Sequence, residues 1–301
     1  MTSSKVNFVF DKKAGVVASY KVGGTEYFNE GFGIQPNFWR APNDNDYGSG
    51  NPKRLEIWEL SSRNFNVTSA TGEIIDGNAI VKVDYKLPAG NQFLVTYKIY
   101  PDGVMNVATH FTPAHLDGVK IGISEATATA TFSPGRANVS ERDKMVVPRI
   151  GVRFRLPATM DQLEYFGRGP LENYWDRKNA AYVGLYKNTV TGMEEAYVRA
   201  QSMGNRDDVR WLTLKSLDNQ GIRITSKDHL NFSALHFTDP ELWELTYGHD
   251  LDNIRRAEVI LNLDCIQRGI GNGSCGPGPR PHYEIEKNKN YSYSFRIENA
   301  K

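Results

Sequence analysis

Two short segments of this chain gather residue types that can do chemistry within a few positions of each other. Residues 167–177 read GRGPLENYWDR, and residues 37–48 read NFWRAPNDNDYG. Gly and Pro interrupt regular strands and helices, so we expect both segments to be shaped loops. Loops that carry carboxylates, guanidinium groups and aromatic rings are common places for binding and catalysis.

Two hypotheses describe the segment 37–48. In the first, Trp39 or Tyr47 offers an aromatic face to the apolar side of a sugar ring, while Asp and Asn side chains bind its hydroxyls. In the second, Asx turns hold the loop and an arginine pairs with one of its carboxylates. The polar candidates are Arg40, Asp44, Asn45 and Asp46. The sequence leaves both hypotheses open.

The segment 167–177 contains two carboxylates, Glu172 and Asp176. Retaining glycosidases need two carboxyl groups about 5–5.5 Å apart, and a spacing of four within a loop does not establish that distance. The alternative is a structural ion network. Its members would be Arg168, Glu172, Asp176 and Arg177. We prefer this network to a catalytic pair.

A third loop is rich in glycine: residues 269–279 read GIGNGSCGPGP. A lone GxGxG pattern is weak evidence for phosphate binding. No helical pattern follows it, so the pattern does not predict a dinucleotide site.

The elements between these loops alternate apolar and polar residues with a period of two, which predicts β-strands. The predicted strands are residues 79–87, 93–100, 104–111, 151–156, 211–217, 222–226, 259–263 and 291–297. Pro101-Asp102-Gly103 predicts a hairpin turn between two of them. Only residues 51–60 and 238–247 predict short helices, each with Pro near its start. We expect residues 1–301 to form one all-β domain of stacked antiparallel sheets.

Composition excludes several classes of partner. The 301 residues carry 36 Lys and Arg against 35 Asp and Glu, a formal net charge of +1. Such a weak field predicts neither nucleic acid nor a membrane as partner. The six histidines form no HxH or HExxH pattern, so we expect no metal site. Cys265 and Cys275 lack zinc-site spacing and are expected to be free thiols.

The first two loops together resemble two signatures of the C-terminal β-sandwich domain of glycoside hydrolase family 2 bacterial β-galactosidases. Those signatures run roughly W-R-A-P-x-D-N-D-x-G and G-x-G-P-x-E-N-Y-x-D-R, and both occur here in the same order. The resemblance implies a large antiparallel supersandwich like that of galactose mutarotase. It also implies that the chain is a C-terminal fragment of a larger, multidomain bacterial enzyme, cytoplasmic or periplasmic.

The resemblance further implies that catalysis belongs to two glutamates of a separate TIM barrel, so no catalytic residue is expected here. The partners implied are galactosides, that barrel and the other domains of the parent chain. No cofactor is expected in this domain, while Mg or Na would belong to the catalytic domain. The substrate-binding residues implied are Trp39, Arg40, Asp44, Asn45, Asp46, Ser274 and Cys275. Cys275 stands where some members place a sugar-stacking tryptophan.

Two other functions remain open from the sequence. A stand-alone carbohydrate-binding module would show exposed aromatic rings without a coupled acid–base pair. An enzyme similar to aldose 1-epimerase needs a histidine and a carboxylate within hydrogen-bond reach. The candidates for that pair are His229, His236 and Glu258.

Overall fold

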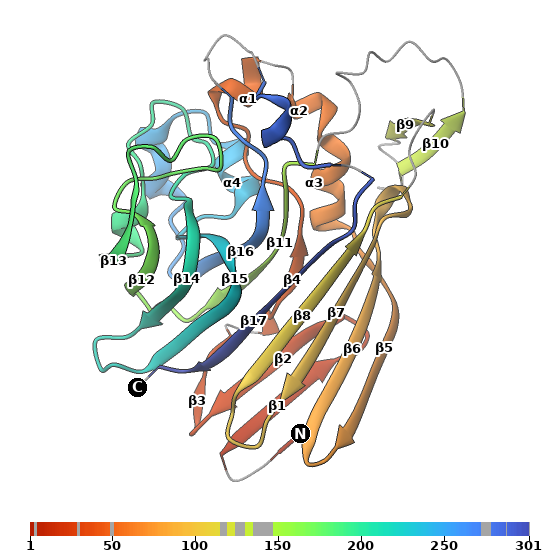
Figure 1. Cartoon of the computed structure of the whole chain (residues 1–301), viewed down its shortest axis with the longest axis vertical. Coiled ribbons are helices and arrows are strands. Elements are labelled where there is room, and N and C mark those ends of the chain that lie inside the picture. The colour runs from red at the N-terminus through yellow and green to blue at the C-terminus, as the bar shows by residue number, and fades with distance from the viewer. Residues whose placement is uncertain are drawn as a thin grey trace.

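The protein is built around one curled antiparallel sheet (Figure 1). The computed structural model describes residues 1–301 except 3–4, 29–30, 49–50, 115–118, 124–129, 135–146, 272–277, 287 and 301. Its twelve-stranded sheet runs in the order β13-β12-β14-β15-β17-β8-β7-β6-β5, with β11, β16 and β4 attached beside this path. The first strands form a separate sheet, β1-β2-β3, and β9 pairs with β10.

The strands have the following bounds. They are β1 Val6–Asp11, β2 Val16–Val22, β3 Thr25–Glu26, β4 Gln35–Asn37, β5 Asn66–Ile75, β6 Asn78–Lys86, β7 Gln92–Ile99, β8 Met105–Thr112, β9 Val119–Ile123, β10 Ala130–Pro134, β11 Arg149–Leu156, β12 Gln162–Gly169, β13 Tyr182–Thr189, β14 Arg206–Lys215, β15 Gly221–Leu235, β16 Val259–Gln267 and β17 Tyr291–Asn299. Each predicted strand corresponds to one of these, so the all-β prediction is confirmed.

Alternation explains how the sheet buries one face. In β6, β7 and β8 every second side chain, such as Val83, Val95 and Val107, is almost completely buried, whereas the residues between them are partly or fully exposed. Gly103 joins β7 to β8 with φ of +97°, the left-handed region that glycine adopts without strain. The predicted hairpin is therefore present.

The long strand β15 connects the two parts of the sheet. Its first half pairs with β17 as far as Thr225, and its second half pairs with β16 from Asn231 onward. Between these positions β15 leaves β17, so the sheet splits there. On the other side of β16, strand β11 pairs along its whole length and also pairs with β4.

The described residues form four α-helices where at most two were expected. They are α1 Asp44–Gly48, α2 Asn51–Arg54, α3 Glu56–Arg63 and α4 Asp239–Glu244. The expected helix at 51–60 is divided into α2 and α3, and α1 forms inside a segment predicted as a loop. Thr238 and Glu241 form a capping box at the start of α4.

All four helices lie at one end of the molecule, opposite the chain termini (Figure 1). None of the helices that the structure describes is long and apolar enough to cross a membrane.

Candidate functional site

A small pocket lies at the helical end, where the three loops meet. Its volume is about 160 Å³. It is lined by Asn43, Asp44, Asn45, Glu172, Tyr174, Arg177, Tyr197, Gln201, Ser202 and Ile270. Residues 43–45 come from the first loop, 172–177 from the second and 270 from the start of the third. We call it the loop pocket.

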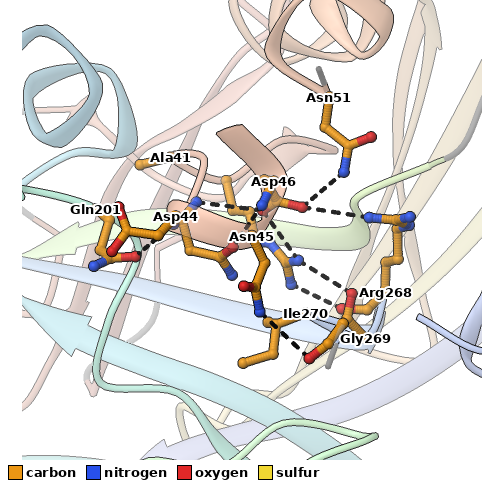
Figure 2. A network of polar contacts seen from close by, with 12 residues as sticks. Ala41, Asp44, Asn45, Asp46, Asn51, Gln201, Arg268, Gly269 and Ile270 are labelled. Carbon is orange, nitrogen blue, oxygen red and sulfur yellow. Dashed lines mark hydrogen bonds and ion pairs between the residues drawn. The ribbon is translucent and has the colours of Figure 1, made fainter. Parts of the chain in front are cut away.

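The loop pocket rests on a buried ion network centred on Asp46 (Figure 2). The Asp46 carboxylate lies 3.3 Å from both the Arg40 Nη2 and the Arg268 Nη1, and all three side chains are at most 4% exposed. Asn51 also donates to Asp46, at 2.9 Å, and the Arg268 guanidinium forms a bidentate pair with Glu284 at 2.6 and 2.8 Å. Among the described residues of this network, two cations thus face two anions.

This network joins the first loop to the third. The Arg40 guanidinium donates to the carbonyl oxygens of Arg268 and Gly269, at 2.8 and 3.4 Å. The Asn45 side-chain amide donates to the carbonyl of Gly271 at 3.4 Å. The third loop therefore starts directly beside the first (Figure 2).

The second loop is attached to the same place. The Asp176 carboxylate accepts hydrogen bonds from the backbone N–H groups of Ile270 and Gly271, at 3.0 and 2.9 Å. The Arg40 guanidinium lies over the Tyr174 ring, 5.7 Å from its centroid. Arg40 thus contacts both of the other loops.

A second buried ion cluster forms hydrogen bonds with the backbone of the first loop. Arg149 on β11 pairs with Asp239 at 3.1 Å and with Asp264 on β16 at 2.9 Å. Asp239 in turn accepts from the backbone N–H of Ala41, and Arg149 donates to the carbonyl of Trp39. Burial raises the pKa of Asp264 to about 6 even though Arg149 lies beside it.

Glu172 is the carboxylate placed deepest in the second loop. Its two oxygens accept from the Tyr197 hydroxyl at 2.7 Å and from the Gly204 N–H at 2.6 Å. Burial raises the pKa of Glu172, and these two hydrogen bonds partly offset that effect. The chain's own donors thus hold both oxygens.

The predicted four-residue ion network of the second loop is wrong. Arg168 pairs with Asp208 on β14, while Glu172 and Asp176 accept from the hydroxyl and backbone donors given above. The strands bring Arg168 to Asp208 across the sheet, and the turn 171–177 points the two carboxylates in different directions. Within the described part of the chain, Arg177 has no ion pair and lines the loop pocket.

The candidate sugar-binding residues of the first loop separate into two groups. Trp39 is 3% exposed and belongs to the hydrophobic core, so it cannot offer a face to a sugar, and that part of the prediction is wrong. Arg40 and Asp46 are buried and form the ion pair that the second hypothesis anticipated. Asp44 is exposed and Asn45 half-buried, and both line the loop pocket.

The three remaining candidates are Tyr47, Ser274 and Cys275. Tyr47 is 53% exposed, with the Arg199 guanidinium 4.3 Å from the centroid of its ring. Ser274 and Cys275 lie outside the described residues.

Sequence reasoning missed one segment of the site altogether. Tyr197, Gln201 and Ser202 line the loop pocket from an irregular stretch between β13 and β14. Gln201 accepts from the backbone N–H of Asp44 at 3.1 Å. This stretch has neither a motif nor a periodic pattern, so no signal in the sequence identified it.

The acid–base pair expected of an epimerase is not formed by these candidates. His236 contacts the backbone carbonyl of Glu258 at 3.2 Å, whereas the Glu258 carboxylate pairs with Arg155 and Arg256. His229 lies 3.7 Å from Asp208, whose pKa is lowered by hydrogen bonding to Arg168 and Lys178 despite partial burial. Neither histidine lines the loop pocket.

Solved structures with a similar fold include two galactose mutarotase-like proteins. A galactose mutarotase-like protein from Lactobacillus casei superposes with a TM-score of 0.51, at 11% identity over 99% of this chain and 98% of that one. A galactose mutarotase related enzyme from Lactobacillus acidophilus gives the same TM-score, at 10% identity over 100% and 96% of the two chains. At these identities the likeness shows a shared fold alone.

Sequence similarity identifies the family. The family described as "Beta galactosidase small chain" matches residues 2–297. A β-galactosidase of Priestia megaterium is 30% identical over 90% of this chain and 23% of its own length. One from Halalkalibacterium halodurans is 27% identical over 87% and 24%. The chain belongs to the β-galactosidase small chain family, and it spans about a quarter of the length of these relatives.

Proposed function

We propose that this chain is the part of a larger β-galactosidase that borders and closes the galactoside site, and that it supplies no catalytic carboxylate. The observation that carries the proposal is the convergence of all three loops on one small pocket above the buried Arg40–Asp46–Arg268 network. The relatives' greater length supports the view that another part of the enzyme completes the site.

The lining of the loop pocket suits a neutral sugar. It presents the Arg177 guanidinium, several amides, two carboxylates and two phenol groups within a small volume, and these groups can exchange hydrogen bonds with ring hydroxyls. A pocket of about 160 Å³ is smaller than typical ligand pockets of about 300–1,000 Å³. It therefore represents part of a galactoside site, whose remainder the catalytic domain would provide.

We assign a structural role to Glu172. Retaining hydrolysis needs a nucleophile and an acid/base about 5–5.5 Å apart on either side of the scissile bond. Glu172 is held by Tyr197 and Gly204, and the other pocket carboxylate, Asp44, is exposed on the rim. In this proposal the TIM barrel of the parent enzyme supplies both catalytic glutamates and forms the covalent glycosyl-enzyme.

We also propose that the domain works without a cofactor of its own. Among the residues that the structure describes, no group of three or more His, Cys, Asp or Glu side chains is arranged to hold a metal ion. Any Mg or Na that the parent enzyme uses would belong to its catalytic domain.

Hydrolysis of nitrophenyl β-galactoside by the purified chain tests the absence of catalysis. We expect no turnover above background. Turnover that disappears in Glu172→Gln, while Glu164→Gln on β12 retains it, would show that the chain carries its own catalytic acid.

Lactose titration followed by NMR tests the binding role. We expect millimolar affinity, because an open half-site buries little of a sugar. Asn45→Ala should weaken this binding, whereas Asn78→Ala in the remote β5–β6 hairpin should not. Micromolar affinity would favour an independent carbohydrate-binding module, a role for which the exposed Tyr47 and Tyr247 rings are suitable.

A further inference from the structure

A second, larger groove crosses the outer face of the sheet, away from the loop pocket. Its volume is about 550 Å³, within the usual range for ligand sites. It is lined by Thr96, Lys98, Asn106, Val107, Ala108, Thr225, Ser226, Lys227, Ser294, Phe295 and Arg296. These residues come from β7, β8, β15 and β17, which run below the helical end (Figure 1). We call it the sheet groove.

Strand register explains why the surface is hollow here. Thr96, Ala108 and Ser294 lie opposite one another on neighbouring strands and form a row of short side chains. The next row on the same face consists of long side chains: Lys98 opposite Asn106, and Asn106 opposite Arg296. Residues directly opposite in a ladder point to the same face, so the short row forms the floor and the long row a wall.

The split between β15 and β17 forms the end of the sheet groove. Pairing between these strands stops at Thr225 and Arg296, and β15 then turns toward β16. Beyond that point the Ser226 hydroxyl donates to the Ser294 carbonyl at 2.7 Å. Lys227 follows Ser226 and is exposed at this end.

Charge in the sheet groove is of one sign. All three ionisable residues that line it, Lys98, Lys227 and Arg296, are cations, although the whole chain is almost balanced. Arg296 pairs with Glu298 at 2.9 Å, whereas Lys98 and Lys227 pair with no carboxylate of the described residues. Since strands lie about 4.8 Å apart, Lys98 and Arg296 are roughly 10 Å from each other across Asn106.

The lining distinguishes between ligand classes. Its one aromatic residue, Phe295, is 3% exposed, so no ring is available to stack on a neutral sugar. Hydroxyl and amide groups of Thr96, Asn106 and Ser294 can bind ligand hydroxyls, while the cations favour a negative group. We propose that the sheet groove binds a saccharide carrying a carboxylate or a phosphate, at a site separate from the loop pocket.

NMR titration of the isotope-labelled chain tests this proposal with four probes: galacturonate, galactose 6-phosphate, inorganic phosphate and galactose. We expect the two anionic sugars to shift the backbone signals of Asn106, Ala108 and Ser294 with millimolar affinity. Galactose should leave these signals unchanged, and inorganic phosphate should bind more weakly than galactose 6-phosphate. Any shifts that galactose causes at Asn45 and Gln201 report separately on the loop pocket.

Charge-removing variants show whether the sheet groove itself is responsible. Lys98→Gln and Arg296→Gln should each weaken binding by about fivefold, the effect of losing a partly exposed ion pair. Lys187→Gln on β13 removes the same charge at a remote exposed position and should change nothing.

Three results would overturn the proposal. The first is equal affinity for inorganic phosphate and galactose 6-phosphate, which would indicate an adventitious ion only. The second is unchanged affinity in both Lys98→Gln and Arg296→Gln. The third is no binding of either anionic sugar.

Discussion

Replacing Asp46 by Asn tests whether the buried ion network holds the loop pocket together. Among the described residues, the oxygens of Asp46 accept from the side chains of Arg40, Arg268 and Asn51 and from the backbone N–H of Asn43. An amide keeps the shape but places an NH₂ group against two of these donors. It also removes the negative charge that the buried Arg40 and Arg268 guanidinium groups share.

The expected cost is large because the site is almost dry. Arg40 and Arg268 are 2% exposed and Asp46 is 4% exposed, and breaking a buried ion pair by removing one partner costs about 3–5 kcal/mol. Domains have total stabilities of about 5–15 kcal/mol, so Asp46→Asn should lose a large fraction of the free energy of unfolding. Urea unfolding followed by tryptophan fluorescence measures this loss as a lower midpoint.

Asp44→Asn is the matched control. It makes the same chemical change two residues earlier in α1, where the side chain is exposed, and should stay within about 0.5 kcal/mol of wild type. The double variant Arg40→Met/Asp46→Leu should be more stable than Asp46→Asn, because it removes a buried pair rather than one partner. If the two Asn variants unfold at the same urea concentration, the Asp46 network contributes little and this reasoning is wrong.

Three further predictions concern the supports of the site. Burial raises the pKa of Asp264 from 3.8 to about 6, so between these values the native state binds more protons than the unfolded chain and stability rises as pH falls. Relative to Asp264→Asn, wild type should therefore gain on the order of 1 kcal/mol in urea unfolding between pH 7 and pH 5, and a loss on acidification would contradict this. Gly151→Ala should lower the free energy of unfolding by about 1–3 kcal/mol, because an added Cβ would lie 2.9 Å from the Asp264 Cα and closer still to its carboxylate. The control is Gly77→Ala, where no atom lies near and only the φ of +76° opposes the substitution. Thr238→Ala should lower thermal stability by about 1 kcal/mol through loss of the capping box on α4, and an unchanged melting temperature would show that the cap is dispensable.

The sequence predicted eight of the seventeen strands found in the described residues, because alternation is a local signal. Side chains in a β-strand alternate with a period of two, and Pro-Asp-Gly at 101–103 specifies the turn between β7 and β8 from local sequence alone. Gly, Pro and Asx clusters also predicted the irregular turn at 170–177, whereas α1 forms within the first segment and residues 272–277 of the third lie outside the described residues. The helices at 44–63 were predicted poorly because they are short and gain their stability from packing rather than from propensity.

Burial of charge could not be predicted in the same way. A charged residue is expected on the surface unless a partner is known, and Arg268 meets Asp46 across 222 positions of the chain. Such pairing is set by which strands adjoin, not by any local pattern. The same limit applies to the prediction that Trp39 contacts a sugar, because the burial of its ring in the hydrophobic core depends on residues distant in the sequence.

Buried ion pairs fix the relative positions of the three loops that form the loop pocket. The loops at 43–46, 172–177 and 268–271 have few backbone ladder bonds, so directional side-chain bonds must fix their positions relative to one another. Arg40 does this by donating to two carbonyls of the third loop while its charge is balanced by Asp46. Apolar packing is non-directional and would bury these loops without fixing which oxygen faces which donor. Asp44 and Asn45 therefore have defined positions on the pocket rim, and under the proposed function this would lower the entropy lost when a galactoside binds.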